Sequence, residues 1–136
     1  MKKILVCRET DPRETRVALI PDDIKRLISM GYEVKVTRGA GEKSGFNDEA
    51  YEKAGAVLVS SNEAGYEGSE IILRIMKPES IQGIPSGALH LSYLDPFNEK
   101  ELLNDFAKSG IQAVSLEMIP RTTLAQKMDV QSSQTS

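Results

Sequence analysis

Short strand-like runs alternate with segments of helical periodicity, and this alternation constrains the fold of the chain more than any other feature. The strand-like runs are apolar or alternate between apolar and polar residues, as buried strands do. They cover residues 3–7, 32–37, 56–59, 71–76, 88–94 and 111–116. Strands that are joined by helical crossovers lie parallel in one sheet. The sequence therefore predicts an α/β fold of flavodoxin-like or Rossmann-like type, doubly wound, with a mostly parallel sheet and helices on both faces.

Three segments combine the helical pattern with signals for where a helix starts or stops. The first begins at Pro21, a residue suited to the first turn of a helix, and ends before Gly31. A second, short helix is expected over residues 48–54. The third is predicted to open at Asn98, because Glu101 follows three residues later as in a capping box.

The composition fits one soluble domain and excludes several kinds of site. The chain has 136 residues and is 40% hydrophobic, which suffices for a buried core. No apolar run approaches the ~18 residues that span a bilayer, so we expect a soluble, cytosolic chain. One cysteine and one histidine exclude an internal disulfide and a closed zinc site. A net charge of -3 leaves no basic footprint for nucleic acid.

Glycines follow the second predicted strand, at the edge of the sheet where doubly wound folds bind ligands. Gly39, Gly41 and Gly45 are candidates for a loop that lets the backbone approach a pyrophosphate. Their spacing departs from the dinucleotide fingerprint, and no acidic residue ends the next strand to hold a ribose. Glu42 also interrupts the Gly-Lys pair of a phosphate loop. We therefore interpret these glycines as a tight turn.

Charged residues follow the first strand at its carboxyl end. Glu9, Arg13 and Arg16 include two guanidinium groups that can bind a carboxylate or phosphate. The alternative is a solvated loop whose charges form local ion pairs. Both interpretations of Arg13 and Arg16 stay open at this level.

Residue types of a catalytic triad occur on the fifth strand-like run but cannot act together. His90 and Ser92 are alternate residues of one strand and share a face, so they cannot converge with Asp95 as nucleophile, base and orienter. We expect His90 to be structural. Cys7 lies in an apolar strand with no group arranged to activate it, so we expect an inert thiol.

The last segment is polar and contains the side chains that an amide-bearing ring such as nicotinamide requires. A guanidinium, a carboxamide, a carboxylate and a hydroxyl occur there, on Arg121, Gln126, Asp129 and Ser132. The alternative is a frayed polar tail. We divide the chain accordingly into an α/β domain over 1–120 and a mobile loop or tail over 121–136.

Several stretches together resemble the alanine dehydrogenase and nicotinamide nucleotide transhydrogenase superfamily. They are RETDPRETRVALIP from residue 8, GAGEKSGFNDEAY from residue 39, AGAVLV from residue 54 and EIILRI from residue 70. Alanine dehydrogenases carry a lysine where this chain has Met76 and a histidine where it has Asp95. The stretch IPRTTLAQKMDVQSSQ from residue 119 is similar to the nicotinamide-contacting loop of the transhydrogenase branch. Ile20 departs from the family, which usually has a threonine that caps the following helix.

The resemblance implies the first subdomain of the NAD(H)-binding component of a proton-translocating transhydrogenase. In that branch hydride passes between NAD(H) and NADP(H), and NADP(H) is bound on a partner component. A Rossmann subdomain beyond the position of Ser136 would hold most of the NAD(H), and the chain alone would be inactive. The implied cofactor-binding residues are Arg121, Gln126, Lys127, Met128, Asp129 and Ser132.

The same resemblance implies partners and excludes a metal cofactor. We expect membrane and NADP-binding components as partners, a homodimer or other self-association, and a cytoplasmic location peripheral to the inner membrane. Two alternatives remain. One is a stand-alone, non-catalytic domain of the same fold that binds an anion or a nucleotide. The other is the substrate domain of an alanine- or saccharopine-type dehydrogenase, which Met76 and Asp95 disfavour.

Overall fold

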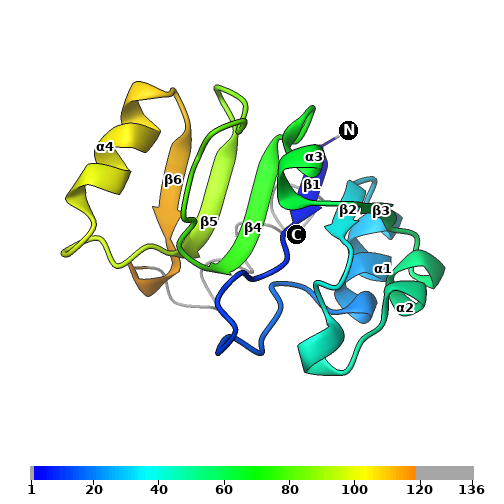
Figure 1. Ribbon diagram of the computed structural model, residues 1–136. Coiled ribbons are helices and arrows are strands. Elements are labelled where there is room, and N and C mark those ends of the chain that lie inside the picture. The colour runs from blue at the N-terminus through cyan, green and yellow to red at the C-terminus, as the bar shows by residue number, and fades with distance from the viewer. Residues whose placement is uncertain (1, 119–136) are drawn as a thin grey trace.

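Six parallel strands form one sheet in the order β3-β2-β1-β4-β5-β6 (Figure 1). The computed structural model describes residues 2–118. The strands are β1 (Lys3–Val6), β2 (Glu33–Thr37), β3 (Val57–Val59), β4 (Ile71–Met76), β5 (Leu89–Tyr93) and β6 (Gln112–Ser115). Each of them falls on a strand-like run of the sequence, which confirms the predicted α/β fold with a parallel sheet.

The first strand is the central one. Ile4 pairs with Val34 of β2 on one side and with Ile71 of β4 on the other. The strand order reverses between β1 and β4, and the crevice at such a point is where doubly wound sheets bind ligands. The pairing of β4 with β5 shifts register between Leu73 and Met76, near the carboxyl end of the strand.

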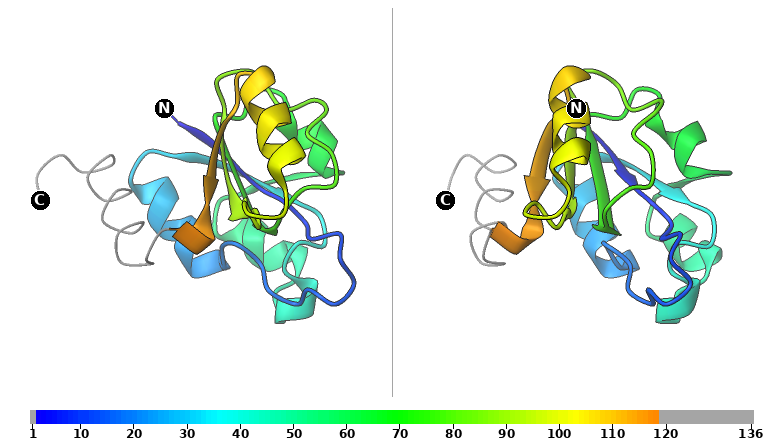
Figure 2. Two further views of the ribbon diagram at one scale, coloured as in Figure 1. Left: turned by 90° about the vertical axis from the view of Figure 1, so that its left-hand side faces the viewer. Right: turned by 60° about the vertical axis from the view of Figure 1, so that its left-hand side comes forward.

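Helices cover both faces of the sheet, as Figure 2 shows in views from its side. They are α1 (Pro21–Ser29), α2 (Asp48–Lys53), α3 (Asn62–Tyr66) and α4 (Lys100–Lys108), with short 3-10 helices at Glu42–Ser44 and Leu116–Met118. Helices α1 and α2 pack in one hydrophobic core, and α3 and α4 in another on the opposite face. The two buried layers leave the loops at the carboxyl ends of the strands free to form a site.

Helix α1 begins without the side-chain cap that a threonine would supply. Ile20 is the N-cap residue and offers no side-chain acceptor. Its own backbone N–H donates to the carboxylate of Asp23 at 3.1 Å. Half of a capping box therefore persists, and Ile24 and Leu27 bury the apolar face.

One helix was missed by the sequence analysis, and the predicted start of another was wrong. Helix α3 was not predicted, because a five-residue segment with Gly65 inside shows no helical period. Helix α4 does not open with a capping box at Asn98: its N-cap is Glu99, which makes no side-chain cap hydrogen bond. Asn98 instead belongs to the turn before the helix: the backbone N–H groups of Asn98 and Glu99 donate to the Asp95 carbonyl at 3.1 and 3.0 Å, and the Asn98 amide donates to the Asp95 carboxylate at 3.0 Å.

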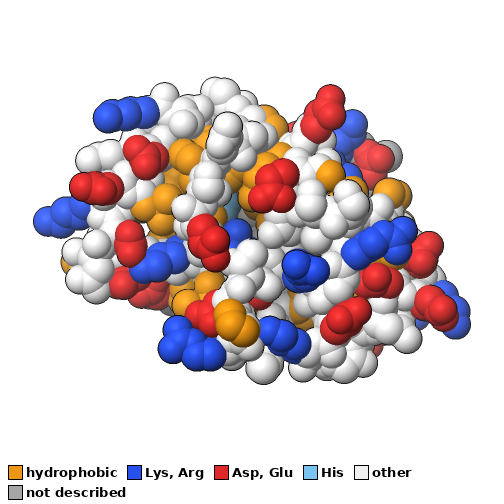
Figure 3. Space-filling view, viewed as in Figure 1, with side chains coloured by type: hydrophobic (Ala, Val, Ile, Leu, Met, Phe, Trp, Pro, Cys, Tyr) orange, Lys and Arg blue, Asp and Glu red, His pale blue; other side chains and the backbone are white. Residues whose placement is uncertain are grey.

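The molecular surface is mixed in charge. On the face shown in Figure 3, acidic and basic side chains are interspersed, with no large area of a single sign. Among residues 2–118, no helix combines the length and apolarity needed to cross a membrane. The predicted boundary at residue 120 lies outside the described residues.

Candidate functional site

Polar and charged side chains gather at the carboxyl edge of the sheet, where the parallel strands all end. The residues that follow β1, β4, β5 and β6 include Glu9, Lys77, Asp95 and Glu117. Parallel strands bring these positions together although they are far apart in sequence. This edge is therefore the place to look for a site.

Glu9 links the ends of β1 and β4. Only 9% of its surface is exposed. Its carboxylate accepts hydrogen bonds from the backbone N–H groups of Ile75 at 2.7 Å and Met76 at 2.9 Å. At the same end of β4, the Arg74 guanidinium donates to the Met76 carbonyl at 2.7 Å. Glu9, which the sequence placed beside two candidate arginines, thus has a structural role in fixing the end of β4.

The two candidate arginines, Arg13 and Arg16, are each paired with an acidic residue two positions earlier. Arg13 contacts Asp11 at 3.3 Å, and its side chain is 90% exposed. Arg16 makes two hydrogen bonds of 2.9 Å to the Glu14 carboxylate. These bonds hold the pKa values of the Asp11 and Glu14 carboxyls below their usual range. Local ion pairs are therefore present, and anion binding by Arg13 and Arg16 stays a prediction.

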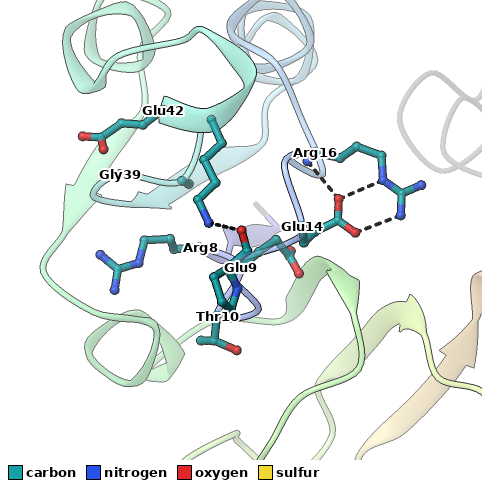
Figure 4. Close-up of a pocket in the computed structure, with 10 residues that line it drawn as sticks. Arg8, Glu9, Thr10, Glu14, Arg16, Gly39 and Glu42 are labelled. Carbon is teal, nitrogen blue, oxygen red and sulfur yellow. Dashed lines mark hydrogen bonds and ion pairs between the residues drawn. The ribbon is translucent and has the colours of Figure 1, made fainter.

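The two arginines do not share one cavity. Arg16 lines a cavity of about 350 Å³ between the loops after β1 and β2, whereas Arg13 is outside its lining. The Arg16 guanidinium also lies over the Tyr93 ring at 5.8 Å. Figure 4 shows Arg16 turned toward Glu14, with Arg8 and Gly39 on another side of the cavity. A fork formed jointly by Arg13 and Arg16 is not present.

Lys77 is the centre of a charged cluster that the sequence alone did not reveal. Its ammonium group forms an ion pair with Glu99 and lies 3.9 Å from the Asp95 carboxylate. The hydrogen bond to Glu99 raises the pKa of Lys77 and is the largest effect. Burial opposes this rise, and the charges of Glu99 and Asp95 add to it. The signal available in the sequence was only a lysine at the end of a strand.

Asp95 adopts a backbone conformation that non-glycine residues rarely take, with φ at 53°. Its N–H donates to the Glu117 carboxylate at 2.6 Å, and Asn98 donates to its side chain. Asp95 and Lys77 thus occupy the ends of β5 and β4 as an ion-paired unit, next to the half-buried Met76.

His90, Ser92 and Cys7 belong to the buried core. His90 is fully buried, stacks near Phe106 with ring centroids 4.9 Å apart, and has no hydrogen-bond partner among the described residues. Burial, and secondarily the charge of Arg74, lower the pKa of His90 to about 3. Burial raises the pKa of the Cys7 thiol to about 12. Both residues are structural, as the sequence predicted.

In the turn after β2, glycine is required at two positions because neighbouring side chains pack closely against the backbone. A Cβ atom at Gly41 would lie 2.6 Å from the Tyr51 ring, and one at Gly39 would lie 3.3 Å from Cδ of Arg8. Gly39 also has a φ of 81°. Backbone hydrogen bonds of 3.0 Å close the turn, from the Ala40 N–H to the Thr37 carbonyl and from the Ser44 N–H to the Gly41 carbonyl. The tight-turn interpretation is confirmed.

The predicted nicotinamide-contacting residues lie outside the described residues. They are Arg121, Gln126, Lys127, Met128, Asp129 and Ser132. Within residues 2–118, no group of three His, Cys, Asp or Glu side chains could hold a metal ion.

Known proteins similar to this chain fall into two groups of oxidoreductases. The NAD(P) transhydrogenase subunit alpha of Cereibacter sphaeroides is 36% identical over 133 residues, covering 96% of this chain and 25% of that protein. An alanine dehydrogenase of Halomonas elongata is 32% identical over 142 residues, covering 95% of this chain and 38% of that protein.

Solved structures give the same result in three dimensions. The crystal structure of transhydrogenase from Sinorhizobium meliloti matches with a TM-score of 0.83 and 37% sequence identity, over 98% of this chain and 40% of that one. The chain thus spans between a quarter and two fifths of the length of these relatives. The family model described as alanine dehydrogenase/PNT, N-terminal domain, matches residues 5–136. On this match, the chain belongs to the alanine dehydrogenase/PNT N-terminal domain family.

Proposed function

We propose that the chain is the N-terminal part of the NAD(H)-binding alpha subunit of an NAD(P) transhydrogenase. That enzyme would transfer hydride between NAD(H) and NADP(H), coupled to proton translocation. The observation that carries the proposal is the 36% identity to a transhydrogenase alpha subunit over 96% of the chain. Since the chain is only a part of such a subunit, it would be inactive alone.

The carboxyl ends of β4 and β5 favour this branch over alanine chemistry. Met76 and Asp95 stand where the resemblance places the lysine and histidine of alanine dehydrogenases. The Asp95 carboxylate lies 3.9 Å from the Lys77 ammonium. A carboxylate ion-paired with a lysine is a different group from the catalytic histidine that the resemblance assigns to alanine dehydrogenases at this position.

The cofactor would be held mostly outside this chain. The glycine turn after β2 departs from the spacing of the dinucleotide fingerprint, and no acidic residue ends β3 to hold a ribose. We propose that a Rossmann subdomain binds most of the NAD(H), and that a loop over 121–136 contacts the nicotinamide ring. NADP(H) would be bound by a partner component. The role of this loop would be to position the rings for direct transfer.

The partners would be the membrane and NADP-binding components of the complex, at the cytoplasmic side of the inner membrane. The domain would also self-associate, covering apolar surface that a second subdomain would otherwise bury. Analytical ultracentrifugation is expected to show dimers or larger species, and a clean monomer at high concentration would count against this part of the proposal.

A pair of chimeras tests the function. In one, this chain replaces the equivalent N-terminal portion of the transhydrogenase alpha subunit of Cereibacter sphaeroides; in the other, it replaces that of the alanine dehydrogenase of Halomonas elongata. We expect hydride transfer from NADH to an NADP+ analogue in the first, and no alanine oxidation in the second. Alanine oxidation by the second, with a folded but inactive first chimera, would overturn the proposal.

The isolated chain provides a second test. Calorimetric titration of the 136-residue chain with NADH should give no binding in the micromolar range, since most cofactor contacts would be missing. Micromolar binding by the chain alone would contradict the proposed division of the site.

A further inference from the structure

A cavity between the loop after β1 and the turn after β2 has features that the proposed function does not use. Its volume is about 350 Å³, and Arg8 and Lys43 contribute cationic groups to its lining. It opens at the carboxyl edge of the sheet, where ligands of this fold class bind. A ligand can bind to these cationic groups only if carboxylates of the protein do not already neutralise them.

Arg8 is held by hydrogen bonds to its backbone, while its guanidinium group has no ion-pair or hydrogen-bond partner within residues 2–118. The Arg8 N–H donates to the side chain of Asn62 at 2.9 Å, and the Asn62 amide donates back to the Arg8 carbonyl at 3.0 Å. The side-chain stem rests against Gly39, whose missing Cβ leaves that space open. Among residues 2–118, no carboxylate is ion-paired with the guanidinium within 4.0 Å. Within the described residues, Arg8 thus has a fixed backbone and an exposed guanidinium with free donors.

Lys43 supplies a second cation from the opposite loop. Its ammonium group donates to the Pro12 carbonyl at 3.0 Å, which ties the turn after β2 to the loop after β1. An ammonium group has three donors, so two remain for a ligand. The lysine therefore reaches the cavity already oriented.

Two of the three carboxylates in the lining are already occupied. Glu9 accepts two backbone N–H groups, and Glu14 accepts two hydrogen bonds from the Arg16 guanidinium. Within the described part of the chain, Glu42 is the lining carboxylate with no hydrogen bond to its side chain. Its Cδ would lie 3.8 Å from a Cβ at Gly39, on the side where Arg8 lies, as Figure 4 shows. Glu42 is placed to compete with an incoming anion for Arg8.

We infer that this cavity binds the phosphate group of a small phosphate monoester between Arg8 and Lys43. A guanidinium fork and an ammonium point charge together satisfy several phosphate oxygens. The cavity is several times larger than a phosphate ion, so a small organic group fits beside it. The inference rests on residues 2–118 alone and is independent of the transhydrogenase assignment.

Isothermal titration of the 136-residue chain tests the site, with inorganic phosphate, ribose 5-phosphate and adenosine 5'-monophosphate as probes at constant ionic strength in chloride. Arg8→Ala and Lys43→Met should each weaken binding by about tenfold to a hundredfold, as expected for losing charged hydrogen bonds. Glu42→Gln should strengthen binding severalfold, because it removes the competing carboxylate. Arg26→Ala removes an equal charge from the exposed side of α1 and should change nothing.

The outcomes separate the possible sources of the phosphate. Tighter binding of either ester than of inorganic phosphate, lost in Arg8→Ala, supports the monoester site. Equal binding of all three probes would reduce the site to free phosphate and overturn the ester. Affinities that are unchanged in Arg8→Ala and in Glu42→Gln would overturn the site itself. Circular dichroism confirms folding, and the gain in Glu42→Gln keeps the test decisive if Arg8→Ala does not fold.

Discussion

The Glu9 carboxylate accepts a hydrogen bond from the backbone N–H of Met76 at 2.9 Å, across 67 positions of sequence. This bond and its neighbour at Ile75 fasten the end of β1 to the end of β4 where the strand order reverses. The geometry of the crevice therefore depends on one buried acidic side chain.

Glu9→Ala should destabilise the domain strongly. The variant leaves two backbone N–H groups without an acceptor, at about 1–3 kcal/mol for each group that stays buried. Urea unfolding followed by circular dichroism measures the change. Glu52→Ala, on the exposed side of α2, is the matched control and should stay within about 0.5 kcal/mol of the wild type. Equal stabilities for the two variants would show that water replaces the carboxylate.

His90 should make the domain sensitive to acid. Its pKa is about 3 in the folded protein, against an ordinary value of 6.5, so the unfolded chain binds one more proton between these values. Above pH 6.5 the neutral His90 does not reduce the free energy of unfolding. As the pH falls from 6.5 toward 3, the free energy of unfolding decreases by roughly 1.4 kcal/mol per pH unit because of this residue.

The variant His90→Leu isolates this contribution. As the pH falls from 6 to 4, its free energy of unfolding should decrease less steeply than that of the wild type. The two slopes should differ by about 1.4 kcal/mol per pH unit, which corresponds to one bound proton. Urea titrations at several pH values give both slopes. Equal slopes would mean that His90 takes up its proton over the same pH range in the folded and the unfolded protein.

Gly41 should be intolerant of any side chain. Its φ of -100° is ordinary, so backbone strain is not the reason. A Cβ would lie 2.6 Å from the fully buried Tyr51 ring, and we expect Gly41→Ala to cost roughly 1–3 kcal/mol. In a Tyr51→Leu background the same substitution should cost less, because the ring is gone. A double-mutant cycle with no coupling would assign the clash elsewhere.

The two carboxylates of the Lys77 cluster, Glu99 and Asp95, should raise the pKa of Lys77 to different extents. The hydrogen bond to Glu99 is the largest cause of the raised pKa of Lys77, and the charge of Asp95 contributes less. Glu99→Gln should therefore lower that pKa more than Asp95→Asn does. Nuclear magnetic resonance titration of the lysine Cε signals checks the order, with the exposed Lys53 as an internal reference. The reverse order would identify Asp95 as the principal partner.

The sheet could be predicted from the sequence because its signals are local. All six strands and three of the four helices follow from periodicity, together with Pro21 and Gly31 at the ends of α1. Helix α3 lacked such a signal, since Gly65 is there for packing: a Cβ at that position would lie 2.5 Å from Leu5. The cap at Asn98 was mispredicted because Asp95, in its left-handed conformation, begins a turn that includes Asn98, so the helix starts later.

The site was less predictable because its contacts join distant segments. The pairing of Arg16 with Glu14 is local and belonged to one of the two interpretations offered. The contact of Glu9 with the end of β4 and that of Asn62 with Arg8 span more than fifty residues. No sequence pattern within a short window predicts such contacts.

The tight turn after β2 could be predicted from the sequence, because the spacing of its glycines departs from that of the dinucleotide-binding fingerprint.

The central position of β1 has a consequence for how the chain folds. Of the six described strands, β1 comes first in the sequence; it is bordered by β2 and by β4, and β4 begins only at Ile71. Its hydrogen bonds therefore stay half made until most of the domain has emerged from the ribosome. Sheets with such distant pairings fold slowly and expose apolar strands meanwhile. Removing the residues of β1 would thus delete a central strand of the sheet.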